Sequence, residues 1–490
     1  MRGSGILMHI SSLPSDFGIG TLGKESYEFV DFLSETGQKY WQVLPIGPTS
    51  YGDSPYQSPS AFAGNPYFID LPTLESEGLL CHGDYAHLPF SYDPEKVDYG
   101  AVYYYRGKVF DIINERFDES RYPDFEEFCR DNRPWLDDYA LFMSIKDENE
   151  GKCWNKFPEE LKYHRDEEIK KAAERLASPI RKYKILQFLF FRQWKALKEY
   201  ANKKNVSIFG DMPIYVAYDS SDVWASPHIF ELDGDLLPRR VAGCPPDAFS
   251  ELGQRWGNPL YEWEKQKNDV FEWWIKRIDH AMRLFDLVRI DHFRAFADYY
   301  AIPSDEETAV HGQWEWGPGM AFFDTLRERL GKVNIVAEDL GMLTPAVTDL
   351  LRSSGFPGMK VLQFAFDGEG DNLYRPHNYE KNCVVYIGTH DNDTLCGWLD
   401  SASPETVARA KKYLRISESE KTAEEIMAAA MASAGDTVII TIQDLLGLGG
   451  EARMNTPSTK ENNWTFRVDK NYLRDINKDF LIQCTKMYSR

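Results

Sequence analysis

The chain has 490 residues, of which 43 % are hydrophobic and 27 % charged, and its formal net charge is −21. This hydrophobic fraction supports an extensive core and excludes a disordered or fibrous protein. The negative charge repels phosphate backbones and anionic membrane surfaces, so we expect no nucleic-acid partner and no membrane partner, whereas a neutral ligand fits this field.

Seven cysteines are scattered along the chain, and no two of them have C-x-x-C spacing. This pattern predicts neither a disulfide framework nor a metal site. The apolar run at residues 5–10 is interrupted by His9 and is too short for the core of a signal peptide. No stretch is long and apolar enough to predict a membrane-spanning helix. We therefore expect a protein of the reducing cytoplasm.

In chain order, eight short apolar runs predict buried parallel strands, because both faces of each run are hydrophobic and turn residues follow. Helical patterns lie between several of them, including 25–36, which ends at Gly37 as a C-cap, 271–284 and 404–434. Eight strands separated by helices predict an α/β protein with a (β/α)8 TIM barrel rather than an open sheet. The predicted strands are 5–10, 40–45, 206–209, 285–290, 334–337, 359–366, 383–387 and 437–442.

The uneven spacing of these strands indicates two insertions. The interval after the second strand contains helical stretches such as 180–203, so we interpret 50–204 as a mostly helical insertion. Residues 213–273, after the third strand, are rich in Pro, Gly and Trp and form a second insertion with an active-site loop. Loops after barrel strands build the active face, so both insertions should crowd it. We expect residues 1–490 to form a single catalytic barrel without a separate C-terminal β-sandwich domain.

Four predicted strands end in acidic residues, at Asp211, Asp291, Glu338 and Asp391. A carboxylate beside an apolar core needs polar partners, so one such strand end is ordinary but four are harder to explain by chance. If the strands are parallel, all four side chains gather at the C-terminal mouth of the barrel. The sequence thus predicts a cluster of carboxylates at that mouth.

The surroundings of these carboxylates suggest different roles. Arg289 and Asp291 are two residues apart and point to the same side of a strand, and a neighbouring arginine favours the ionised carboxylate that a nucleophile requires. Glu338 follows a wholly apolar run, where partial burial would raise its pKa as a general acid requires. Asp391 follows His390 in a polar cluster able to hold sugar hydroxyls. Retaining glycoside chemistry uses two carboxylates in such opposed environments.

Each of these residues also has an ordinary structural explanation. Asp211 or Asp391 alone could be a helix cap or a turn residue. Asp291 could be a salt-bridge partner of Arg289, and Glu338 could begin a helix. The coincidence of all four at strand ends favours the catalytic interpretation.

At these positions the chain resembles a known superfamily. The motifs Asp211, Arg289-x-Asp291-His292, Glu338 and His390-Asp391 are similar to the four motifs of the α-amylase superfamily. More specifically, the chain resembles the amylomaltases (4-α-glucanotransferases, or disproportionating enzymes). Five stretches carry this resemblance: SSLPSDFGIGTLG, YWQVLPIGPTSYGDSPYQSPSAFAGNPYFID, GDMPIYVAYDSSDVW, CPPDAFSELGQRWGNPLY and LQFAF. These stretches extend over nearly the whole chain, and no catalytic position departs from the pattern.

The resemblance implies roles for individual residues. Asp291 would be the nucleophile, Glu338 the acid/base and Asp391 a stabiliser of the distorted sugar. The remaining residues implied to bind or position substrate are Tyr56, Asp211, Arg289, His292, His390, Phe364 and, in the family's flexible loop at 247–259, Phe249, Gln254, Trp256 and Asn258. Loop packing is the alternative role for Trp256.

The resemblance also implies an activity: transfer of α-1,4-glucan segments from a donor maltooligosaccharide to the 4-hydroxyl of an acceptor glucan or glucose, with retention. It implies no cofactor and no metal, and nothing indicates an obligate protein partner. Two alternatives are an α-1,4-glucan hydrolase with the same carboxylates and an inactive glucan-binding protein. The inactive protein would be expected to lack a carboxylate, and all three catalytic carboxylates are present.

Overall fold

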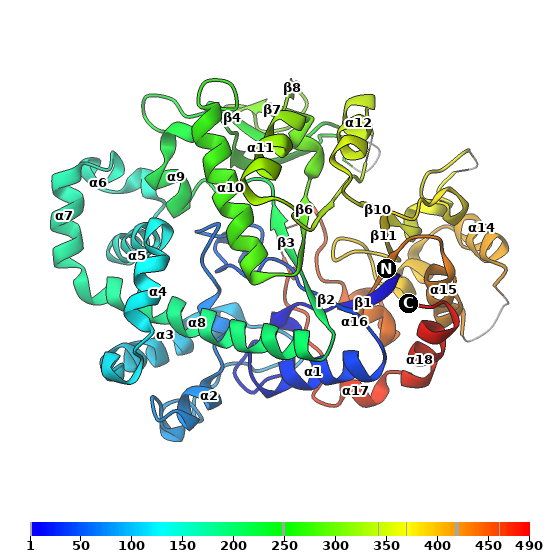
Figure 1. Cartoon of the computed structure of the whole chain (residues 1–490), viewed down its shortest axis with the longest axis horizontal. Helices are drawn as coiled ribbons and strands as arrows, with labels where there is room; N and C mark the ends of the chain where they lie inside the picture. Colours follow the sequence, from blue (N-terminus) through cyan, green and yellow to red (C-terminus); the bar gives the residue numbers. More distant parts are fainter. Residues whose placement is uncertain (1, 247–249, 342, 369, 417–420, 460) are drawn as a thin grey trace.

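The computed structural model describes residues 2–246, 250–341, 343–368, 370–416, 421–459 and 461–490. An eight-stranded parallel sheet lies at its centre, in the order β10-β11-β12-β1-β2-β3-β6-β9 (Figure 1). A backbone hydrogen bond of 2.9 Å from Ala337 N–H, at the end of β9, to Pro357 O, beside β10, brings the two edges of the sheet together. The predicted (β/α)8 barrel is confirmed. Its strands are β1 (Gly3–Leu7), β2 (Tyr40–Gln42), β3 (Ser207–Pro213), β6 (Leu287–Asp291), β9 (Ile335–Ala337), β10 (Gly358–Val361), β11 (Cys383–Tyr386) and β12 (Thr437–Thr441).

Helices follow or precede these strands along the chain and surround the sheet (Figure 1). The barrel strands are almost wholly buried on both faces, which is why they appear in the sequence as continuous apolar runs. The helices between and after the barrel strands are α1 (Lys24–Glu35), α10 (Lys267–Leu284), α11 (Met320–Leu330), α12 (Pro345–Ser354), α13 (Leu395–Ser401), α14 (Pro404–Leu414), α15 (Thr422–Ala432), α16 (Ile442–Leu445), α17 (Tyr472–Asp475) and α18 (Lys478–Met487).

Between β2 and β3 the chain forms a group of helices that ends in the long α8 (Ala177–Lys203). Phe188 of α8 packs its ring against Phe117, Phe125 and Phe128, so α8 organises the aromatic core of this group. The other helices there are α2 (Leu71–Ser76), α3 (Tyr99–Arg116), α4 (Phe125–Asp131), α5 (Arg133–Glu148), α6 (Glu159–Lys162) and α7 (Asp166–Arg175).

The same helix holds the loop that follows β2. Gln187 of α8 exchanges two hydrogen bonds of 2.8 Å with the backbone of Gly64. A Cβ at Gly64 would lie 2.0 Å from the ring of Phe190, so the loop can approach α8 this closely only with glycine there. The end of this loop at Gly64 is thereby fixed against α8.

A second, antiparallel sheet lies beyond the barrel strands in the order β5-β4-β7-β8. Its strands are β4 (Arg240–Cys244), β5 (Gln254–Pro259), β7 (Asp298–Pro303) and β8 (Gln313–Trp316), and the short helix α9 (Ser221–Ala225) precedes them. Two of these strands come from the segment after β3 and two from the segment after β6. We did not predict this sheet, because β5 contains a glycine and a proline and shows no clean alternation of apolar and polar residues.

Several predicted strands differ in their bounds from the structure, for example 5–10, which is Gly3–Leu7, and 40–45, which is Tyr40–Gln42, and one is wrong over most of its length. The run 359–366 is not one strand: β10 ends at Val361, and Leu362–Phe366 form the 3-10 helix η9. There Gln363 N–H bonds Ile387 O and its side-chain amide bonds Asp393 O, which turns the chain away from the sheet. The run 404–434, predicted to be rich in helix, contains the two helices α14 and α15, and Arg415 caps the end of α14 in a left-handed conformation.

Candidate active site

The acidic residues predicted at strand ends occupy the C-terminal side of the barrel. Asp211 lies within β3 and Asp291 ends β6, while Glu338 and Asp391 follow β9 and β11. Parallel register pairs Asp211 with Arg289 across β3 and β6, so both side chains stand at the same level of the barrel.

Arg289 joins two of these carboxylates. Its Nη1 donates to both oxygens of Asp211, at 2.9 and 2.8 Å, and its Nη2 donates to Asp291 Oδ1 at 2.6 Å. Burial acts to lower the pKa of Arg289, but the two carboxylates outweigh it and raise that pKa well above its ordinary value. A permanent cation therefore holds Asp291 in place, and the side chain of Asp291 remains 30 % exposed to the mouth.

Glu338 lies beside Asp291 in a more enclosed environment. Its Oε2 accepts from His292 N–H and its Oε1 from Leu340 N–H, both at 2.7 Å. Burial raises the pKa of Glu338 to about 7, and the charge of Asp291 also raises it. Arg289 and the two N–H donors lower this pKa but do not outweigh burial. Near neutral pH this carboxyl group can both give and take a proton, as a general acid/base must.

Asp391 belongs to a third group of polar residues. Asn455 Nδ2 donates to Asp391 Oδ1 at 2.6 Å, and His390 Nε2 lies 3.4 Å from Asp391 Oδ2. The His390 ring stacks on that of Tyr56, with centroids 5.2 Å apart and planes at 13°, and Trp464 lies 5.9 Å from His390.

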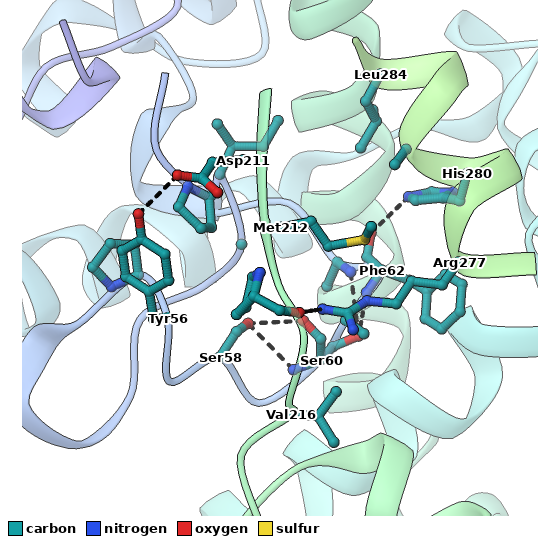
Figure 2. Close-up of a pocket in the computed structure, with 18 of the residues that line it drawn as sticks. Tyr56, Ser58, Ser60, Phe62, Asp211, Met212, Val216, Arg277, His280 and Leu284 are labelled. Carbon is teal, nitrogen blue, oxygen red and sulfur yellow. Dashed lines mark hydrogen bonds between the residues drawn. The ribbon is translucent and has the colours of Figure 1, made fainter. Parts of the chain in front are cut away.

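Tyr56 connects this group to Arg289. Its hydroxyl donates to Asp211 Oδ2 at 2.9 Å (Figure 2). Burial, together with the Asp211 charge, raises the pKa of Tyr56 well above its ordinary value, so its hydroxyl stays protonated and remains a donor. The chain Tyr56–Asp211–Arg289–Asp291 is a continuous set of hydrogen bonds across the mouth.

The second sheet contributes Trp256 and Gln254 to the same region. Trp256 meets the ring of His292 edge-on, with centroids 4.8 Å apart at 88°, and its Nε1 donates to Gln254 Oε1 at 3.1 Å. Burial lowers the pKa of His292 to about 3, so its ring is neutral over the working range of pH. His292 itself adopts the left-handed conformation, with φ of 55°, directly after Asp291.

The structure does not place every implied residue equally close to the carboxylates. Asn258 is buried, and its side-chain amide donates a hydrogen bond of 2.8 Å to Val216 O. Part of the hydrogen-bonding capacity of Asn258 is therefore used within the loop. Phe364 lies on η9 and packs edge-on against Tyr374, with centroids 5.5 Å apart. Phe249 lies outside the residues that the structure describes.

Comparison with known proteins identifies the family. The family profile described as 4-alpha-glucanotransferase matches residues 8–472. The chain belongs to this family. A 4-alpha-glucanotransferase from Clostridium butyricum is 47 % identical over 99 % of this chain and 100 % of its own, and one from Thermus thermophilus is 45 % identical over 95 % of both.

A solved structure agrees with this assignment. An amylomaltase from Streptococcus agalactiae, in complex with acarbose, superposes with a TM-score of 0.97 at 42 % identity, covering 100 % of both chains. The resemblance inferred from the sequence motifs is confirmed. The comparisons favour a 4-alpha-glucanotransferase over the alternative hydrolase.

For this 4-alpha-glucanotransferase, the sequence motifs missed the contribution of the segment after β12. Asn455 bonds Asp391, Arg453 donates to the backbone oxygen of Asp391, and Trp464 packs against Tyr56. The available signal was topological, since loops after every barrel strand contribute to the active face.

The structure also bears on metals and membranes. No group of three or more His, Cys, Asp or Glu that could hold a metal ion occurs in the described parts of the chain. Among the same residues, no helix is long and apolar enough to cross a membrane.

Removal of the Asp211 carboxylate should destabilise the fold. Arg289 and Asp211 are buried, with side-chain exposures of 4 % and 0 %. Asp211→Ala leaves the guanidinium short of two hydrogen bonds, and breaking a buried pair costs about 3–5 kcal/mol. Urea unfolding should show this loss of stability as a lower midpoint. The control is Asp349→Ala, which removes an exposed ion pair and should leave the midpoint unchanged. The side chains of that pair, Asp349 and Arg352, are 72 % and 76 % exposed. Equal midpoints for the two variants would contradict the structural importance of the buried pair.

Proposed function

We propose that this 4-alpha-glucanotransferase moves an α-1,4-glucan segment from a donor maltooligosaccharide to the 4-hydroxyl of an acceptor glucan or glucose, by retaining double displacement. The observation that carries the mechanism is the pairing of Asp291, held by Arg289, with Glu338, whose pKa is raised to about 7. These are the two environments that a nucleophile and a general acid require.

In the first step, Glu338 protonates the glycosidic oxygen while Asp291 attacks the anomeric carbon. The bond to the leaving oligosaccharide breaks, and a covalent glycosyl–Asp291 ester forms. Because Glu338 Oε2 accepts from His292 N–H, the residue after Asp291, the acid is held beside the nucleophile. We expect the reacting carboxyl groups about 5–5.5 Å apart in the substrate complex.

In the second step, Glu338, now ionised, removes the proton from the acceptor's 4-hydroxyl. That oxygen attacks the anomeric carbon, the ester to Asp291 breaks, and Glu338 regains its proton. Asp391, bonded to Asn455 and close to His390, would hold hydroxyls of the distorted sugar. Asp211 would bind the same sugar beside Tyr56.

Transfer requires an acceptor to compete successfully with water at the ester. Tyr56, which packs against the buried Trp464 and bonds Asp211, and Trp256, which contacts His292 beside Asp291, place aromatic rings near the reacting groups. Such rings exclude water and can hold an acceptor ring in a productive orientation. We assign Trp256 and Gln254 to this acceptor role, and Phe249, Asn258 and Phe364 to substrate contacts made when glucan is bound.

We also propose that residues 1–490 act as one catalytic unit, with segments 50–204 and 213–273 as insertions that build its active face. The first segment supports this through Tyr56, and the second through Trp256. A cytoplasmic location fits the seven cysteines without C-x-x-C pairs, and no cofactor enters either step.

Incubation of the protein with maltotriose alone tests this function. A transferase breaks one bond for each bond it forms, so we expect glucose, maltooligosaccharides longer than the trimer, and nearly constant total reducing ends. Chromatography by chain length and a reducing-end assay measure both. Longer products decide the question, because they form only when an acceptor hydroxyl reaches the Asp291 ester before water.

The two alternatives predict different products. A hydrolase would give only shorter products with steadily rising reducing ends, and an inactive glucan-binding protein would leave the trimer unchanged. Either result would overturn the proposed function.

A further inference from the structure

A second cavity lies on the outer side of the loop that carries Tyr56. Its volume is about 420 Å³, against about 70 Å³ for the cavity beside Tyr56 and Asp211. Its walls come from the end of α4, the start of α5, the α9 region and α10. The volume lies within the range of small-molecule sites, which is about 300–1,000 Å³. We call this cavity the α5–α10 groove.

Three partly exposed aromatic side chains line the groove. The Phe62 ring stacks on Trp135, with centroids 6.3 Å apart at 14°, and meets Trp273 edge-on at 6.1 Å. Each of the three residues is only half-buried, so part of each ring is accessible to a ligand, although the Arg277 guanidinium lies 5.4 Å from the centroid of the Trp273 ring. Trp135 is already oriented, since its Nε1 donates to Asn132 Oδ1 at 3.1 Å. Rigid aromatic faces of this kind accept flat apolar surfaces at little entropic cost.

Two polar groups that line the groove are free to form further hydrogen bonds. Asp138 is half-buried and has no hydrogen-bond partner among the described residues. Burial raises the pKa of its carboxyl group, and the nearby His164 acts against this rise. The Trp273 indole N–H likewise has no partner within the described chain, although it lines the groove. An unpaired acceptor and an unpaired donor beside aromatic faces suit a ligand that carries hydroxyl groups.

The charge of the groove selects against anions. Among the described residues that line it, six are carboxylates and two, Lys276 and Arg283, are permanent cations. These cations pair with Glu272 and Asp279. Burial lowers the pKa of His280 to about 4, so His280 adds no charge at neutral pH. His228 lies 3.7 Å from Asp269. Phosphorylated or acidic ligands would be repelled, and no metal-binding group of three occurs in the described residues.

The groove shares a wall with the active-site loop. His280 Nε2 lies 2.9 Å from Phe62 O, and Ala61 N–H donates to Asp222 Oδ2 at 2.8 Å. The same loop bears Tyr56, which is hydrogen-bonded to Asp211 at one side of the smaller cavity, while His280 and Phe62 lie at the other side of that cavity (Figure 2). The groove and the smaller cavity therefore share Ser60, Phe62 and His280 as lining residues.

We propose that the α5–α10 groove is an accessory site for a neutral α-glucan segment, separate from the catalytic cleft, with Trp135, Trp273 and Asp138 as its principal contacts. This inference rests on the proposed function. A glucan long enough to occupy both sites gains the second contact as an intramolecular event, so the groove favours long chains over trimers.

Two substitutions test the groove by opposite means. Trp135→Leu removes an aromatic face, and Ala225→Trp fills the cavity from the end of α9 without removing any contact. We expect each to raise KM for long linear amylose about tenfold, the equivalent of one aromatic contact, while kcat and the kinetics with maltotriose stay unchanged. Ala177→Trp, the same change at an exposed position of α8 outside the groove, is the matched control and should alter neither substrate.

The outcomes separate the two proposals. A rise in KM for amylose alone, in both variants, supports the accessory site. Thermal unfolding checks that Trp135→Leu stays folded. If Trp135→Leu is unfolded, the kinetics of Ala225→Trp decide the test. Unchanged amylose kinetics, equal loss with both substrates, or the same loss in Ala177→Trp would overturn the accessory site while leaving maltotriose transfer intact. Failure of the wild-type protein to disproportionate maltotriose would instead overturn the proposed function.

Discussion

Asp291→Asn is expected to lower transfer by several orders of magnitude while the protein stays folded. The substitution is nearly isosteric, so the cavity and the contact with Arg289 are largely kept, but the amide cannot form the glycosyl ester. The loss should appear in kcat and kcat/KM together, because the nucleophile acts in the transition state rather than in substrate binding. Initial rates with maltotriose measure it.

The control for this variant is Asp349→Asn, which removes a carboxylate exposed at 72 % on α12 and should leave the rate unchanged. Thermal unfolding should show that Asp291→Asn is folded. A residual rate within about tenfold of wild type corresponds to about 1.4 kcal/mol of barrier and would rule out Asp291 as the nucleophile.

The barrel could be predicted because its strands are buried on both faces. Such strands appear as continuous apolar runs, and Thr437–Thr441 and Cys383–Tyr386 stand out for this reason. The carboxylates could be predicted for a related reason: a charged residue that ends an apolar strand needs partners, and the partners lie at the same mouth. Arg289 lies two residues before Asp291, so the contact between them is visible in the sequence.

The parts of the site that the sequence did not predict depend on long-range packing. Trp256 and His292 were both implied by the resemblance, but the β4–β5–β7–β8 sheet that brings them together was not predicted, and its pairing joins segments on either side of β6. Asn455 reaches Asp391 across 64 positions of the chain. Local patterns carry no information about such contacts, since they are decided by the tertiary fold rather than by propensity.

Glu338→Gln is expected to be nearly inactive with natural glucans and to lose the alkaline limb of the pH profile. The general acid must be protonated at the start of the first step, and the pKa of Glu338 is raised to about 7. The protonated fraction therefore falls as pH rises through about 7, and kcat/KM for maltotriose should fall with it in the wild type. With a glycosyl fluoride, whose leaving group needs no proton, the variant should recover its first step.

Stability gives an independent check on the same group. A folded-state pKa raised above the unfolded value of 4.5 means that the contribution of Glu338 to stability is present below pH 4.5 and is lost as pH rises through about 7. Glutamine imitates the protonated form, so the variant should resist urea at pH 8 at least as well as the wild type. Glu328→Gln, an exposed position on α11, should keep both wild-type profiles. A neutral amide can neither lose the titrating proton nor deliver it to the glycosidic oxygen. An unchanged alkaline limb in Glu338→Gln, or no preference for the fluoride over maltotriose, would therefore contradict the acid/base role of Glu338.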